Sequence, residues 1–184
     1  MRQYLSVLAL FFTVATGCGQ PAALTVHNGY EATISIEGLP SGAATVQAGQ
    51  LARFEGVDRN LRLVALDPSG NELESVKIEL PAPGGESLWN AGGGACFVFG
   101  DFSLYYTAMN NIPASARVIS IVKNTDRSWS SRTPVAAGPG QRLPKNRKGA
   151  TVSALVQVPC EATVSESIAQ GWLEMRLPLL QPEP

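Results

Sequence analysis

The sequence predicts a mainly β protein, built as one or more antiparallel β-sandwiches with one short helix near the C-terminus. Turn-forming residues are plentiful, since the chain of 184 residues has 18 glycines and 13 prolines, while only 16% of its residues are charged. Short runs alternate apolar and polar side chains, as half-buried strands do. Turn signals separate these runs at intervals of about 8–12 residues, a spacing typical of sandwiches and barrels.

The first half of the chain is expected to form six strands. Asn28-Gly29 follows the first of them and is a strong turn signal, because both residues tolerate positive φ. In the sixth, alternation places Glu74 and Ile78 on one face and Lys77 and Glu79 on the other. The six expected strands are residues 24–27, 33–37, 44–47, 51–54, 61–66 and 73–80.

Residues 81–85 (PAPGG) are the best candidate for a boundary. Prolines lack the N–H donor that a sheet ladder needs, and glycines are conformationally permissive. The segment is predicted to be either a linker between two β-domains, residues 24–80 and 86–180, or a crossover loop inside one continuous sandwich.

The second half is predicted to contain further strands and the single helix. The glycine-rich segment 92–94 is expected to form a turn or a close backbone approach, because no lysine is near and strand-like residues follow. Thr163 and Glu166 match a capping box at the start of a short helix that Gly171 ends. The other expectations are strands at 97–106 with a bulge at Gly100, at 118–122, at 151–158 and at 172–177, a polar loop at 130–150 and a frayed tail at 178–184.

The N-terminal segment 1–17 has the order of a secretory signal. Arg2 supplies a positive charge, and an apolar run of eleven residues, 5–15, follows it. That run is shorter than the roughly 20 apolar residues of a membrane span and fits the apolar region of a signal peptide. A buried strand or helix is the alternative reading of the same residues.

The end of this leader, Ala15-Thr16-Gly17-Cys18, resembles the lipobox of bacterial lipoproteins. The resemblance implies that Cys18 is lipidated and becomes the first residue of the mature chain, with residues 18–23 as a tether. It also implies outer-membrane sorting, through Gly19, where the source has two membranes. The chain departs from the family at Ala15, where leucine is preferred. Because Ala-x-Gly is also similar to an ordinary signal-peptidase site, a secreted or periplasmic protein is the alternative.

Three cysteines occur, Cys18, Cys96 and Cys160. Lipid on Cys18 would leave an even number, so Cys96 and Cys160 are predicted to form a disulfide in an oxidising compartment. Two reduced, buried thiols are the alternative, because free cysteine packs as a small hydrophobic residue.

The charge of the mature chain is close to neutral and gives no indication of a nucleic-acid partner. Arg2 lies in the leader, so 13 of the 14 basic residues remain against 15 acidic ones, a net charge of −2. The expected partners are the membrane, through the N-terminal lipid, and a protein of the envelope. A cluster of four cations is predicted to lie in a solvated loop that protects a strand edge. The alternative is that it contacts anionic lipid head groups. Its members are Arg142, Lys145, Arg147 and Lys148.

The sequence offers few residues for catalysis, and no catalytic residue, metal site or cofactor is expected. His27 is the single histidine, so it alone cannot supply the usual ligand set of a transition metal. Glu72, Glu74 and Glu79 are candidates for the paired carboxylates of glycoside hydrolysis, although solvated charge is their ordinary reading. Five large aromatic residues could bind a sugar or a protein, of which only Trp129 has polar neighbours; they are Trp89, Tyr105, Tyr106, Trp129 and Trp172.

These observations predict a non-enzymatic envelope protein, held by a lipid anchor and acting as a structural or interaction module. The alternative is an exported protein that binds or acts on carbohydrate through acidic and aromatic side chains. A pocket with two close carboxylates and flanking aromatic residues would favour the alternative.

Overall fold

The computed structural model describes residues 22–57, 59–81, 85–104, 116–133, 135–143 and 152–180. Residues 1–21 lie outside these ranges, and Cys18 and the predicted leader lie there with them. The described residues form three four-stranded sheets, a short 3₁₀ helix and one α-helix. The expected fold class, a mainly β protein with a C-terminal helix, is confirmed.

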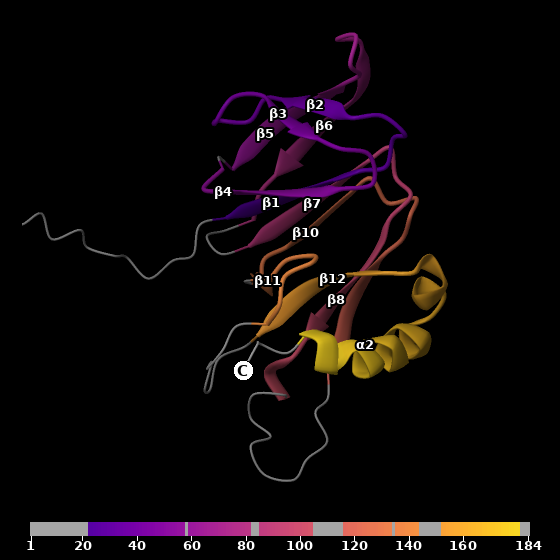
Figure 1. Ribbon diagram of the computed structural model, residues 1–184. Helices are drawn as coiled ribbons and strands as arrows, with labels where there is room; N and C mark the ends of the chain where they lie inside the picture. Colours follow the sequence, from indigo (N-terminus) through magenta and orange to yellow (C-terminus); the bar gives the residue numbers. More distant parts are fainter. Residues whose placement is uncertain are drawn as a thin grey trace, which may run out of the picture.

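The sheets and the helix are stacked in four layers (Figure 1). We call the sheets outer, central and helix-side after their places in the stack. The outer sheet has the order β3 (Ala44–Val46), β2 (Ile34–Glu37), β5 (Asn60–Leu66), β6 (Glu72–Glu79). The central sheet has the order β10 (Ser128–Ser131), β7 (Glu86–Ala91), β1 (Ala23–Asn28), β4 (Leu51–Glu55). The helix-side sheet has the order β11 (Val135–Ala137), β12 (Ser153–Val158), β8 (Cys96–Asp101), β9 (Arg117–Val122).

Strands from both halves of the chain meet in the central sheet. β1 pairs in parallel with β7, with Val26 opposite Trp89, and antiparallel with β4. Every residue of β1 and β7 is buried, because a sheet lies against each face of the central sheet. The segment that joins the halves is described only at Pro81 and Gly85, since residues 82–84 lie outside the described ranges. Besides β1 and β7, the described residues contain one other parallel pair, β11 and β12.

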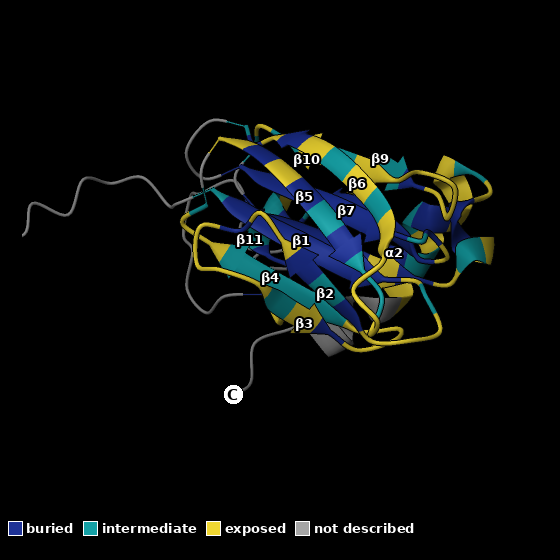
Figure 2. Cartoon of the chain, turned by 90° about the horizontal axis from the view of Figure 1, so that it is seen from above, coloured by how far each residue is buried: buried dark blue, intermediate teal, exposed yellow. Residues whose placement is uncertain are grey.

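Three apolar clusters fill the spaces between the layers, and their members come from facing elements. Leu24, Val26 and Trp89 of the central sheet pack against the outer sheet. Leu88 packs against Phe97 and Phe99 of the helix-side sheet. The far face of that sheet packs against the helix, and Figure 2 shows the interior strands as largely buried.

The register between β8 and β9 shifts between Phe99 and Gly100, so an irregularity lies at the predicted position. The extra residue is on the partner strand, because Phe99 pairs with Ser120 and Gly100 with Val118, which leaves Ile119 of β9 unpaired. The strand expected at 97–106 ends at Asp101, and Tyr105 and Tyr106 lie outside the described residues. Two strands, β10 and β11, begin within or beside the segment predicted as a polar loop. That prediction was wrong because Trp129 and Val135 pack into the cluster between the central and helix-side sheets, so tertiary burial outweighs a polar local composition.

The C-terminal predictions require the largest correction. One helix, α2 (Glu166–Leu180), follows η1 (Cys160–Thr163). It includes Gly171, which was expected to end a helix, the expected last strand at 172–177 and the first residues of the expected tail. Ala169 and Leu173 are fully buried four residues apart, which is helical spacing, and their contact with the helix-side sheet explains why the helix continues through Gly171. The predicted capping box is also wrong. Ser165 accepts from the Ile168 N–H at 3.3 Å, while the Thr163 hydroxyl donates to the Cys160 carbonyl at 2.7 Å.

Candidate functional site

The polar groups that the fold buries are concentrated on one face of the central sheet. Alternation along β1 and β7 directs Leu24, Val26 and Trp89 towards the outer sheet. The intervening residues therefore point towards the helix-side sheet, and most of them are polar. Four of these side chains are at most 5% exposed: Thr25, His27, Glu86 and Asn90.

Glu86 is a fully buried carboxylate at the start of β7. The Thr25 hydroxyl donates to its Oε1 at 2.6 Å, and Arg53 Nη2 lies 3.3 Å from its Oε2. Arg53 also pairs with the exposed Glu55. Within the described residues Arg53 Nε is buried without a hydrogen-bond partner. The group connects β1, β4 and β7 at the end where the chain enters the central sheet, and it places a positive charge beside the buried Glu86 carboxylate.

His27 lies further along the same face. Its Nδ1 is 2.9 Å from Asn90 Oδ1, and the Asn90 amide donates to the Ala95 and Asp126 carbonyls at 3.0 and 3.2 Å. Because the amide nitrogen is used in this way, Oδ1 accepts and His27 Nδ1 carries the hydrogen. Burial lowers the pKa of His27, although hydrogen bonds to Asn90 and to the Gly93 backbone act in the opposite direction. The ring is therefore a neutral structural group that fixes the loop after β7.

Glu74 forms the second polar group, between the outer and central sheets. Its Oε2 accepts from the Tyr30 hydroxyl and the Gly92 N–H, both at 3.0 Å, and its Oε1 accepts from Trp89 Nε1 at 3.2 Å. Arg127 Nη1 lies 3.8 Å from Oε2. Burial, and then the contact with Glu74, raise the pKa of Tyr30. Glu74 and Trp89, two candidates from the sequence, are therefore brought together, but as a latch between layers.

The loop that carries Gly92 has the close backbone approach expected from its glycines. All three glycines at 92–94 have φ between +72° and +86°. A Cβ at Gly93 would lie 2.7 Å from the Asn124 carbonyl oxygen and 2.9 Å from Arg127 Nη1. Because only glycine accepts both the conformation and the contact, this loop can lie flat against residues 124–127.

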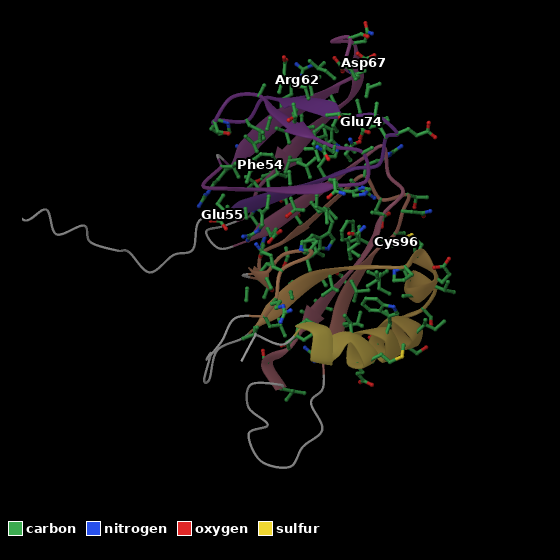
Figure 3. The ribbon with its side chains drawn as sticks, in the orientation of Figure 1. Phe54, Glu55, Arg62, Asp67, Glu74 and Cys96 are labelled. Carbon is green, nitrogen blue, oxygen red and sulfur yellow. A yellow bond between two sulfur atoms is a disulfide. The ribbon has the colours of Figure 1, made fainter. Side chains whose placement is uncertain are left out.

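A disulfide joins Cys96, the first residue of β8, to Cys160, the first residue of η1, with a Cα–Cα distance of 5.1 Å. This is the pairing expected from the cysteine arithmetic. Glu74 and Cys96 lie towards one end of the molecule and Glu55 towards the other (Figure 3). The bridge thus fixes the helical segment to the sheet at the end opposite the start of β1.

The remaining candidates are dispersed. Glu72 and Glu79 are exposed on β6. Trp129 packs on Phe99, with ring centroids 5.0 Å apart, and donates to Ser120 Oγ at 3.1 Å, so its indole is part of an interlayer contact. Trp172 is partly buried against the cluster under the helix. Of the four cations at 142–148, only Arg142 is among the described residues.

Tyr30, Arg53, Glu86 and Arg127 were not among the candidates selected from the sequence. Glu86 carried one weak signal, a carboxylate directly after Gly85 and two residues before the apolar pair Leu88-Trp89. Tyr30 and Arg127 lie in turns, and only the tertiary fold brings them to Glu74. Glu74 is 44 residues from Tyr30 in the chain and also far from Arg127, beyond any local pattern.

Neither a metal-ligand cluster nor a helix able to cross a membrane occurs in the part of the chain that the structure describes. Comparison of the chain with models of protein families, with curated proteins and with solved structures finds no match. A function for this chain must therefore be inferred from its own sequence and structure.

Proposed function

We propose that the protein is a lipid-anchored, non-enzymatic module of the bacterial cell envelope, held at a membrane by acyl chains on Cys18. The observation that carries the proposal is how soon the folded body follows the lipobox-like sequence. The Ala22 carbonyl already accepts from the Gly56 N–H at 3.1 Å, and the Ala23 N–H donates to the Gly85 carbonyl at 3.0 Å. The four residue steps from Cys18 to Ala22 span at most about 14 Å.

A tether of this length would hold one end of the layered body against the membrane. The end beside Ala22 carries Gly56 and Gly85, and the turn at 138–141 also lies there, because a Cβ on Gly138 would be 3.4 Å from Glu86 Oε1. Arg142 follows this turn, and Lys145, Arg147 and Lys148 follow Arg142 in the sequence. A cation such as Arg142 at the end that carries the anchor supports contact with anionic head groups. Lipoproteins carry several acyl chains, and stable attachment requires more than one.

The test is replacement of the lipid-bearing residue in a bacterial host. Cys18→Ser should move the full chain from the membrane fraction to the aqueous fraction and abolish incorporation of labelled fatty acid. The matched control is Cys96→Ser/Cys160→Ser, which removes the other two cysteines and should keep both the label and the membrane attachment. Membrane association of the Cys18→Ser chain equal to that of the unchanged protein would refute the proposal.

A further inference from the structure

A groove of about 320 Å³ opens between the edge of the outer sheet and the edge of the central sheet. Three consecutive residues of β6 line one wall, and three consecutive residues of β10 line the other, with Ser87 between them. The wall residues are Lys77, Ile78 and Glu79 on β6 and Ser128, Trp129 and Ser130 on β10. β6 and β10 lie along the same side of the molecule (Figure 2), so this side presents two strand edges at once.

Ser87 at this groove has an unfulfilled hydrogen bond. Its side chain is 1% exposed, and its hydroxyl has no hydrogen-bond partner among the described residues. Ser130 lies directly opposite it in the β7–β10 pair. A buried hydroxyl without a partner is unfavourable, so the chain's own described groups do not fully satisfy the polar groups at the inner end of this groove.

The backbone groups of both edges point outwards at alternate residues. The Asn90 N–H donates to the Arg127 carbonyl at 2.8 Å, so the pair Asn90–Arg127 is hydrogen-bonded and Ser128 and Ser130, by alternation, direct their N–H and C=O groups away from β7. The Leu80 N–H donates to the Arg59 carbonyl at 2.6 Å.

The same alternation therefore makes Lys77 and Glu79 direct their backbone groups away from β5. Each edge thus offers two residues, two apart in sequence, that can pair with a further strand.

We propose that the occupant is a second copy of this chain, docked about a two-fold axis that passes between the copies at Ile78 and Trp129. In an antiparallel pair centred on Ile78, Lys77 of each copy faces Glu79 of the other. In a pair centred on Trp129, Ser128 of each copy faces Ser130 of the other. Both arrangements are self-complementary, as an isologous interface requires, and each pair exchanges two backbone hydrogen bonds.

One axis can satisfy both edges because the two triplets face each other across a single groove. Ser87 lies one strand further from this axis than β10, at the inner end of the groove. The ladder of β6 ends at Pro81, which has no N–H. Charged side chains prevent two strand edges from pairing when like charges would meet. In this chain the order Lys-x-Glu has the opposite effect, because antiparallel pairing of β6 with β6 of a second copy gives two contacts between opposite charges. That order selects this chain as its own partner rather than an arbitrary extended segment.

The experiment is a charge exchange followed by sedimentation velocity of the full chain in detergent, over a micromolar concentration series. The unchanged protein should show a concentration-dependent dimer. Lys77→Glu and Glu79→Lys should each weaken it about tenfold or more, since each converts both contacts to repulsion. Mixing the two variants should restore the dimer, because positions 77 and 79 would then both be acidic on one chain and both be basic on the other. The double variant Lys77→Glu/Glu79→Lys should also dimerise.

The mixing step makes the test independent of folding, because an unfolded variant would not be rescued by its partner. Glu37→Lys is the matched control, an exposed charge reversal on β2, which lies inside the same sheet, and it should leave the dimer unchanged. A monomeric unchanged protein at every concentration, or a dimer that the single variants do not weaken, would overturn the proposal. Failure of the mixture to associate would also overturn it. The result is separate from the anchor, since Cys18→Ser leaves both edges intact.

Discussion

The two faces of the central sheet are formed by the same strands but are held in different ways. Towards the outer sheet, Leu24, Val26 and Trp89 form an apolar contact without directional requirements. Directional contacts are confined to its end, at the Glu74 latch and at Asn28, whose amide donates to the Val46 carbonyl at 2.9 Å. Towards the helix-side sheet, Thr25 and Glu86 form a hydrogen bond, as do His27 and Asn90. The period of two along a strand makes this division possible, because each residue step changes the face.

The difference teaches how the stack fixes its register. Apolar side chains gain free energy wherever they are buried, at about 25 cal/mol per Å² of apolar surface, so they drive the layers together without selecting one pairing. A shift of one residue would turn Glu86 into the apolar interface and separate it from Thr25 and Arg53. Because a buried carboxylate without partners is strongly unfavourable, the polar face specifies the parallel pairing of β1 with β7.

The largest effect that would sharpen this comparison is expected from Trp89→Ala. Trp89 is fully buried, so truncation should lower the free energy of unfolding by about 3–5 kcal/mol. Trp89→Phe keeps most of the apolar contact, because it retains an aromatic ring and removes the donor to Glu74 with the smaller part of the indole; the loss should be about 1–3 kcal/mol. Urea unfolding followed by circular dichroism measures both. Equal losses for the two variants would mean that the latch, and not the apolar contact, holds this face.

The sequence predicted the strands of this face well and their assembly poorly. Alternation located β1, β5 and β6 and predicted that Glu74 shares a face with Ile78, because those signals are local. The pairing of Val26 with Trp89 is not local, and nothing within either run specifies it. The cysteine pair is also non-local, but it could be predicted because only two cysteines remain once Cys18 is set aside. The Thr25–Glu86 contact, between residues 61 apart, has no such restriction on its partners.

The failure at the C-terminus has a different cause. Within the expected strand 172–177, residues 173–177 (LEMRL) alternate apolar and polar, which indicates a strand, but they are also good helix formers. Burial decides between the two, since Ala169 and Leu173 are spaced for a helix on the helix-side sheet. Gly171 lies in open space and lowers the stability of the helix by about 1 kcal/mol relative to alanine, too little to end it.

The polar face would be tested next by Glu86→Gln. The variant keeps the shape but removes the charge that faces Arg53, and its amide would place a donor against Thr25 or against the guanidinium. Loss of a buried charged hydrogen bond should lower the free energy of unfolding by about 1–3 kcal/mol. Glu55→Gln is the matched control, since it removes the other carboxylate that pairs with Arg53. The Glu55 side chain is 61% exposed. That pair should contribute less than about 1 kcal/mol, and equal losses would contradict the role given to burial.

The smallest effect is the pH dependence that His27 gives to the polar face. Burial lowers the pKa of His27 in the folded state, while the unfolded chain has the ordinary value of about 6.5. Above that pH both states are neutral at His27, so it contributes no pH dependence. As the pH falls through about 6.5, the unfolded chain takes up a proton that the folded chain does not. Stability should then fall by up to about 1.4 kcal/mol per pH unit until the folded pKa is reached.

His27→Asn isolates this contribution, because its amide nitrogen can replace Nδ1 as the donor to Asn90 Oδ1 but does not titrate. The measurement is urea unfolding of both proteins from about pH 7.5 to about pH 5, above the range in which ordinary carboxylates titrate. The unchanged protein should lose stability on acidification more steeply than the variant, even if the variant is the less stable of the two at the upper end of this range. If stability fell in parallel for the two proteins, His27 would keep its ordinary pKa in the fold. The polar face would then admit water and would resemble an exposed sheet face, contrary to its burial.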